Sequence, residues 1–135
     1  MLKIVIPLLC RSKKNSEQII VNPRTNKPMI IQSKYYHQFE RDCGIFLKRY
    51  AKHINIPVNV KVLFYVDTKR KRDLTNLLEA IDDVLVKYQV LEDDNRDIIA
   101  SHDGSLVLYD KENPRTEIEI TKKEGYEQWK KYGKI

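Results

Sequence analysis

The chain has 135 residues, of which 41% are hydrophobic and 33% charged, a composition typical of a globular protein and not of a disordered one. Its net charge of +6 and isoelectric point near 9.2 favour an anionic partner, with nucleic acid ahead of membrane. No run is apolar and long enough to cross a membrane, so we expect a single domain, residues 1–135, in the cytoplasm.

The N-terminal run LKIVIPLL predicts a buried first strand. Because it leads to Cys10 it also resembles a lipoprotein signal, but the run is too short, contains Pro7 and is followed at once by Arg11. We therefore favour the strand. Cys10 and Cys43 lack CxxC spacing and a histidine-rich neighbourhood, so we expect both to be reduced and partly buried, as in intracellular proteins.

The next segments change from strand to helix. Residues 10–18 are polar and basic and predict a loop, and residues 19–32 form two short β-type runs around a Pro/Asn-rich turn, which predicts a hairpin or lid. Ser33 is a good N-cap for a helix in which apolar residues recur at helical spacing from Tyr36 to Tyr50.

The second half of the chain repeats this alternation. Residues 57–66 predict the clearest strand, and apolar residues at helical spacing from Leu74 to about Tyr88 predict a second helix. Residues 98–121 predict two strands with Asp-Gly and Glu-Asn-Pro as turn signals, and the aromatic spacing in residues 122–135 predicts a short amphipathic helix. The order predicts an α+β protein with a small mixed β-sheet and two main helices.

Charge is concentrated in one part of the chain. Four consecutive cations, residues 69–72, directly precede a segment that gathers seven carboxylates in a basic protein. These carboxylates are Asp73, Glu79, Asp82, Asp83, Glu92, Asp93 and Asp94. Carboxylates that are brought together repel one another, and a divalent cation relieves that repulsion.

A helical wheel of the second helix indicates which of these residues lie on the same side of it. One polar stripe, opposite the apolar one, consists of Asn76, Ala80, Asp83 and Lys87, with small Ala80 leaving space in its middle. Asp73 begins the helix and projects toward the same stripe. A structural interpretation stands beside this one, with Asp73 as an N-cap, other acids as a solvated face and LEDDNRD as a polar turn.

The charge pattern fits phosphodiester hydrolysis. Mg²⁺, or Mn²⁺ as a substitute, takes carboxylate oxygens, polarises a phosphoryl oxygen and generates hydroxide. Lys69, Arg70, Lys71 and Arg72 would hold the nucleic-acid backbone through its phosphates. Other metal sites fail on spacing, because the three histidines are far apart and no EF-hand loop aligns; we interpret His102 as a turn residue.

The stretch RDLTNLLEAIDDVL, followed by VLEDD, resembles the RusA family of Holliday junction resolvases. That family's pattern has a basic run, D-L-D-N, a further acid along the helix and a D-D pair. The matching residues here are Asp73, Leu74, Asn76, Asp83, Leu85, Asp93 and Asp94. The likeness extends to the late NPRTEIEI strand and the basic early loop RSKKNS, and several phage and prophage proteins look similar.

The resemblance implies a homodimeric, Mg²⁺-dependent endonuclease that makes paired, symmetric nicks in four-way DNA junctions during recombination and repair. It implies that Asp73 and Asp94 are catalytic metal ligands, and that Asp83 and Asp93 are supporting or ligand acids. The residues expected to contact DNA are Lys13, Lys14, Lys69, Arg70, Lys71, Arg72, Asn76 and Lys87.

Two residues depart from the family pattern. Thr75 stands where the family usually has a second aspartate, and Glu79 stands where many members have a lysine important for catalysis. A third carboxylate of the metal site is therefore expected from Glu79 or Asp83, and Glu79 is a catalytic candidate. The missing positive charge is expected from one of three lysines, Lys69, Lys71 or Lys87.

The length of the second helix limits which acids meet. Residues 74–88 advance about 22 Å as a helix, whereas residues 89–94 span at most about 20 Å when extended. Asp94 therefore reaches Asp83 more easily than Asp73, which makes Asp83 a serious ligand candidate.

Three other functions are compatible with the same sequence. The first is a metal-dependent nuclease on other branched or flap DNA. The second is a non-catalytic junction-binding module that lost its activity through the changes at Thr75 and Glu79. The third is an interaction domain of unrelated function, whose acids would point in different directions.

Overall fold

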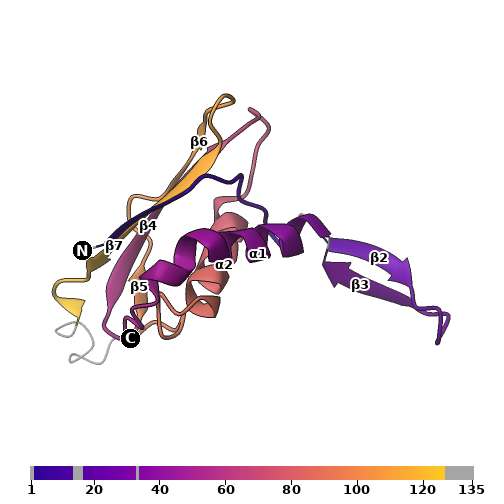
Figure 1. The fold of residues 1–135 in the computed structure, drawn as a ribbon, viewed down its shortest axis with the longest axis horizontal. Coiled ribbons are helices and arrows are strands. Elements are labelled where there is room, and N and C mark those ends of the chain that lie inside the picture. The colour runs from indigo at the N-terminus through magenta and orange to yellow at the C-terminus, as the bar shows by residue number, and fades with distance from the viewer. Residues whose placement is uncertain (1, 14–16, 33, 127–135) are drawn as a thin grey trace.

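The structure, a computed structural model, describes residues 2–13, 17–32 and 34–126. In these residues a mixed five-stranded sheet has two helices against one face, and a two-stranded hairpin projects away from this body (Figure 1). The strands are β1 (Leu2–Ile6), β2 (Glu17–Val21), β3 (Pro28–Gln32), β4 (Val58–Val66), β5 (Ile99–Ser101), β6 (Leu106–Tyr109) and β7 (Arg115–Lys122). The helices are α1 (Lys34–Leu47), followed by the 3₁₀ turn η2 (Lys48–Tyr50), and α2 (Leu74–Lys87). The predicted α+β class is confirmed.

Strand β4 lies at the centre of the sheet, and its residues alternate strictly between buried and half-buried. It pairs antiparallel with β7 along nearly its whole length, and β7 pairs antiparallel with β1 at the edge. On its other side β4 pairs in parallel with β5 near its start and with β6 near its end. Helix α2 is the crossover that returns the chain from the end of β4 to the start of β5. This connection determines where the acidic segment lies.

The sequence predicts two strands after residue 94, but the described residues 95–126 contain three. A turn at Gly104, whose φ of 87° suits glycine, separates β5 from β6. In the gap the backbone N–H of Val62 donates to Ser105 Oγ at 3.0 Å, so a side chain takes the place of a strand partner. The turn lies beside the middle of β4.

The hydrophobic core lies between the helices and the sheet. Ala80, which the wheel assigned to the polar stripe, is only 1% exposed, and that assignment is wrong. Helix α1 also packs against α2, so the buried face of α2 is wider than one apolar stripe. Gly44 of α1 permits the close approach, because a Cβ there would lie 2.7 Å from the Tyr88 ring. Cys10 and Cys43 are free and buried in the same core.

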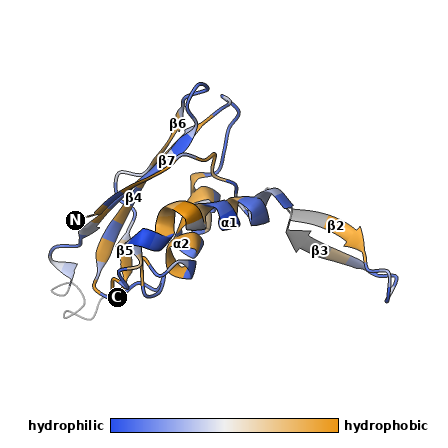
Figure 2. Cartoon of the chain, in the orientation of Figure 1, coloured by the Kyte–Doolittle hydropathy of each residue, from blue (hydrophilic) through white to orange (hydrophobic). Residues whose placement is uncertain are grey.

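The hairpin β2–β3 is separate from this core. Its strands pair in register, with Val21 opposite Pro28, around a turn in which Asn26 has a positive φ of 54°. Ile19 and Val21 are 75% and 60% exposed, and Figure 2 shows the apolar character of β2 on this projecting arm. The hairpin prediction is confirmed.

Two predictions fall partly or wholly outside the described residues. The N-cap Ser33 lies outside them, and so does most of the predicted C-terminal helix, residues 127–135. No helix in the described segments is long and apolar enough to span a bilayer.

Candidate functional site

Asp73 lies at the N-terminus of α2 and acts as its cap. Its backbone is extended, and Oδ1 accepts a hydrogen bond from the backbone N–H of Thr75 at 2.9 Å. The carboxylate is exposed and directly follows the basic residues 69–72. The structural role predicted for Asp73 is therefore confirmed, and the cap leaves its second oxygen available to other partners.

A second group of acids lies toward the other end of α2. Burial raises the pKa of the Asp82 carboxyl, and the negative charges of Asp94 and Asp83 raise it further. Partial burial also raises the pKa of Asp94, with contributions from Asp93 and Asp83. Asp82, Asp83 and Asp94 thus influence one another electrostatically, and we call them the acidic cluster. The chain after α2 brings Asp94 within electrostatic influence of Asp82 and Asp83, whereas a metal site shared by these residues stays a prediction.

Two cations lie against the acidic cluster. Lys13 Nζ is 2.6 Å from Asp83 Oδ2, and this hydrogen bond raises the pKa of Lys13 with help from the charge of Glu79. His102 Nε2 is 2.9 Å from Asp82 Oδ2, and its Nδ1 is 2.8 Å from the carbonyl oxygen of Val60. Because both ring nitrogens face acceptors, the imidazolium form satisfies both contacts. Burial alone would lower the pKa of His102, but these acceptors raise it.

Two of the three lysines named as replacements for the missing family lysine contact other groups. Lys87 Nζ is 2.6 Å from Glu40 Oε1 of α1, and Lys69 lies over the ring of Tyr109 with 5.3 Å between Nζ and the ring centroid. Lys13, from the early basic loop, is the cation in contact with Asp83 among the ion pairs of the described residues. Lys14 lies outside those residues.

Asp93 has a local role. Its Oδ1 accepts from the backbone N–H of Asp94 at 2.7 Å and its Oδ2 from the side chain of Asn95 at 3.1 Å. These bonds, the backbone one first, lower the pKa of Asp93. Asp93 is thus a turn-forming residue, which leaves Asp94 as the member of the D-D pair that interacts with α2.

The described residues contain no group of three or more His, Cys, Asp or Glu side chains that could hold a metal ion. Mg²⁺, however, commonly uses only one or two protein carboxylates together with waters and substrate phosphates. Asp82 Oδ1 is buried and lacks a hydrogen-bond partner within the described structure, and the pKa of both Asp82 and Asp94 is raised, first by burial and then by neighbouring negative charge. The acidic cluster therefore fits a divalent cation that is completed by substrate.

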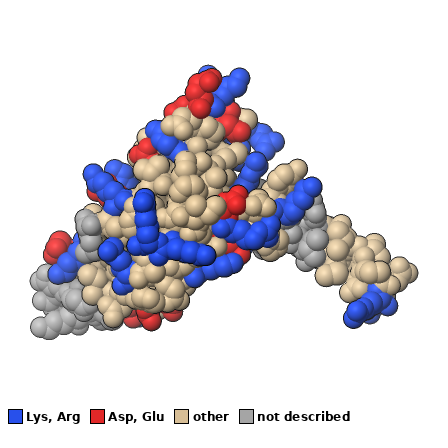
Figure 3. All heavy atoms as spheres, viewed as in Figure 1, with Lys and Arg blue, Asp and Glu red and all other residues tan. Residues whose placement is uncertain are grey.

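Thr68 and the basic residues 69–72 line one side of a groove of about 550 Å³. Its other wall is the C-terminal part of β6, and Val66 lies at its base. Arg72 is mostly buried, with a terminal nitrogen 3.6 Å from Asp67 Oδ1, whereas the three preceding residues are exposed. Figure 3 shows Lys and Arg side chains over much of the visible face, with a separate basic group at the tip of the β2–β3 hairpin. Asn76, half-buried on the first turn of α2, follows this segment.

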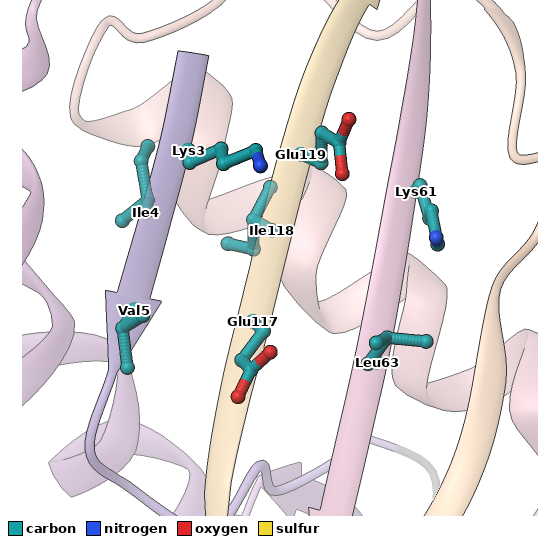
Figure 4. A pocket seen from close by; sticks show the side chains of 8 residues that line it. All are labelled: Lys3, Ile4, Val5, Lys61, Leu63, Glu117, Ile118 and Glu119. Carbon is teal, nitrogen blue, oxygen red and sulfur yellow. The ribbon is translucent and has the colours of Figure 1, made fainter.

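The uncovered face of the sheet has a smaller hollow, of about 150 Å³, with a different character (Figure 4). Glu119 of β7 is paired with Lys3 of β1 on one side and with Lys61 of β4 on the other. This row of alternating charge is a cross-strand arrangement that stabilises sheets. None of the candidate acids of residues 73–94 lines it.

Sequence reasoning missed the His102–Asp82 pair and the Lys13–Asp83 pair. His102 does lie at a turn, since its carbonyl accepts from the backbone N–H of Ser105 at 3.2 Å, but it also contacts α2. No local pattern signals either pair, because each joins segments that only the tertiary fold brings together.

Comparison with known protein families gives a match. The family model described as Endodeoxyribonuclease RusA matches residues 12–121, which include both helices, β4, β5, β6 and all of β7 but its last residue. No curated protein matches the chain.

Proposed function

This chain belongs to the RusA family of endodeoxyribonucleases, and from this premise we propose that it resolves four-way DNA junctions by paired, symmetric, Mg²⁺-dependent nicks. The membership confirms the resemblance carried by residues 73–94, and the chain is an endodeoxyribonuclease, a hydrolase that acts on DNA junctions. RusA nucleases generally depend on a divalent metal. The identity of the metal, the pairing of the nicks and a role in recombination and repair within the cytoplasm are parts of the proposal.

The observation that supports the proposal is the mutual electrostatic influence of Asp82, Asp83 and Asp94, which raises the pKa of Asp82 and of Asp94 beyond the effect of burial. We assign the metal to Asp83 and Asp94, with phosphate oxygens of the DNA completing its ligands. When bound, the metal supplies a Lewis acid and a hydroxide nucleophile. Asp73 stays a catalytic candidate through its match to the family pattern, and its exposed carboxylate lies where the basic segment delivers the strand to α2.

The cations around the acids have distinct tasks in this proposal. Lys13 neutralises Asp83 before DNA arrives and then faces the incoming phosphate. Lys13 thereby supplies the positive charge that Glu79 does not. His102 holds Asp82 in place and limits the repulsion within the acidic cluster. The basic residues 69–72 bind the DNA backbone without reading its sequence.

Two copies of the chain suit this substrate, because a four-way junction presents two strands of like polarity to be cut. We propose a two-fold homodimer in which each protomer contributes one acidic cluster. Light scattering of the purified protein tests this, with a mass near twice 16.0 kDa expected.

The decisive experiment uses a mobile four-way junction, a flapped duplex and a linear duplex of matched sequence, each with and without Mg²⁺. We expect Mg²⁺-dependent nicks at symmetric positions in two strands of the junction and an intact linear duplex. Nicking of the flap in preference to the junction would identify the alternative branched substrate. Tight junction binding without product in Mg²⁺ or Mn²⁺ would identify a non-catalytic module, and equal cutting of all three substrates would contradict structure specificity.

A further inference from the structure

The groove beside residues 68–72 combines two kinds of surface. Lys69, Arg70 and Lys71 expose three cations along one wall, and the aromatic ring of Tyr109 stands on the other. A groove that only had to hold duplex phosphates would need the cations alone. The aromatic wall therefore needs its own explanation.

The register of the sheet explains why Tyr109 is exposed. Tyr109 pairs with Val66 in the parallel ladder, so its side chain is on the face of the sheet against which the helices pack. Helix α2, however, begins only at Leu74, and the top of the sheet extends beyond the helices (Figure 1). The ring is consequently 46% exposed in a groove instead of buried in the core.

The ring is already in contact with a cation. Lys69 Nζ lies 5.3 Å from the centroid of Tyr109, so the aromatic surface and a phosphate-binding group are held together. The basic run ends at Arg72, which is followed directly by the capping Asp73 of α2. A DNA strand that lies in the groove therefore leaves it at the start of α2, the helix that carries the candidate acids.

A ring next to cations suits one particular form of DNA. In a duplex both faces of each base are covered by its neighbours, so a protein ring stacks only on a base that has left the stack. We propose that this groove binds an unpaired nucleotide at the branch point of DNA, with its base stacked on Tyr109 and its adjacent phosphates on Lys69, Arg70 and Lys71. This inference rests on the proposed function and names the part of the branched substrate that the groove recognises.

The test uses a forked duplex with single-stranded arms that carries 2-aminopurine, a base whose fluorescence reports stacking, next to the fork. Binding is measured without divalent metal, so that no cleavage occurs, for the wild type, Tyr109→Leu and Tyr109→Phe. Tyr35→Leu is the matched control, because Tyr35 of α1 is a similarly exposed tyrosine outside the groove. Circular dichroism checks that each variant is folded.

We expect the wild type, Tyr109→Phe and Tyr35→Leu to change the 2-aminopurine fluorescence equally. Tyr109→Leu should lose that change and bind the fork about tenfold more weakly, since stacking on an aromatic ring is lost. Its affinity for a linear duplex of the same length should stay unchanged. An unaltered fluorescence change with Tyr109→Leu, or an equal loss of fork and duplex affinity, would overturn the inference.

The same preparations separate this inference from the proposed function. A wild type that nicks branched DNA in Mg²⁺ while Tyr109→Leu behaves normally contradicts the groove assignment alone. A wild type that never nicks, but whose fluorescence change depends on Tyr109, contradicts the nuclease proposal and leaves the groove assignment supported. A wild type that binds neither the fork nor a four-way junction overturns both.

Discussion

His102 and Asp82 are joined by a 2.9 Å contact between Nε2 and Oδ2, which connects the end of β5 to α2. The Nδ1 of the same ring contacts the Val60 carbonyl oxygen, so the imidazole connects β5, β4 and the helix. One histidine thus fixes the position of α2, and of the acidic cluster on it, against the sheet.

Replacing His102 should destabilise the fold by an amount that depends on pH. Folding raises the pKa of His102, so the pair stabilises the fold fully below the ordinary histidine pKa of about 6.5 and loses this contribution as the pH rises through the raised value. The pKa of Asp82 is raised as well, because burial outweighs pairing, so protonation of Asp82 removes the ion pair in acid. His102→Gln should therefore lower the free energy of unfolding by about 1–2 kcal/mol near neutrality.

Urea unfolding followed by circular dichroism, at about pH 6 and about pH 9, measures this difference between wild type and variant. The difference should be larger at the lower pH. His37→Gln, at an exposed position of α1, is the control and should show no such dependence. A difference that is constant across the range would mean that the imidazole is neutral throughout.

Asp94→Asn should lower junction nicking by at least about a hundredfold, because the amide supplies no negative charge to a metal ion. Junction affinity should stay the same or increase, since a carboxylate that repels phosphate is removed. Gel-based nicking under single-turnover conditions and fluorescence anisotropy measure the two quantities. Glu124→Gln, an exposed acid outside the cluster, is the charge-matched control. Nicking at the wild-type rate would remove Asp94 from the site.

Asp73→Asn separates capping from chemistry. Asparagine caps a helix about as well as aspartate, so the free energy of unfolding should change by less than about 0.5 kcal/mol. We expect nicking to be lost, as it is for Asp94→Asn, because the resemblance assigns Asp73 a catalytic role. Normal nicking in a variant of normal stability would leave Asp73 with the cap as its role and centre the site on Asp83 and Asp94.

Lys13→Gln should change metal binding and catalysis in opposite directions. Lys13 competes with a metal ion for Asp83, so its removal should lower the Mg²⁺ concentration that half-saturates the protein in calorimetric titration. The nicking rate at saturating Mg²⁺ should fall, because the phosphate loses a nearby positive charge. Lys48→Gln, at an exposed position of η2, is the control. Unchanged Mg²⁺ affinity would show that Asp83 is not a ligand.

Gly44→Ala should destabilise the fold although alanine favours helices. The added Cβ would lie 2.7–2.9 Å from atoms of the Tyr88 ring, and that ring is held by its hydroxyl, which donates to the Glu40 carbonyl oxygen at 2.8 Å. We expect a loss of about 1–3 kcal/mol in the free energy of unfolding, measured by urea titration. The double variant with Tyr88→Leu should recover part of it, whereas Ile45→Ala, at the exposed neighbouring position, should not show this loss. Equal effects of Gly44→Ala with and without Tyr88 would rule out the clash.

Local periodicity was sufficient to predict the main elements. The alternation of residues 58–66 and the apolar spacing from Leu74 onward depend only on which face of one element is buried, and both were confirmed. Periodicity failed at Ala80, which is buried in the core that residues of α1 and α2 share. It also failed to separate β5 from β6, since that break depends on Gly104 and on the bond from Val62 to Ser105.

The candidate site was predictable in composition but not in arrangement. Chain length alone favoured a meeting of Asp94 with Asp83, and the electrostatic influence between them supports that expectation. The partners Lys13 and His102 come from segments far from α2 in sequence, so no spacing rule within residues 69–94 could have named them.

Hydrogen exchange in the projecting β2–β3 arm should report which molecule lies against it. A ribbon of two strands is marginally stable in water when nothing lies against it, so its backbone amides should exchange hydrogen with solvent far faster than those of β4. Slower exchange in residues 17–32 with rising protein concentration would locate a second copy along the arm. Slower exchange only when a junction is added would instead locate the arm against DNA.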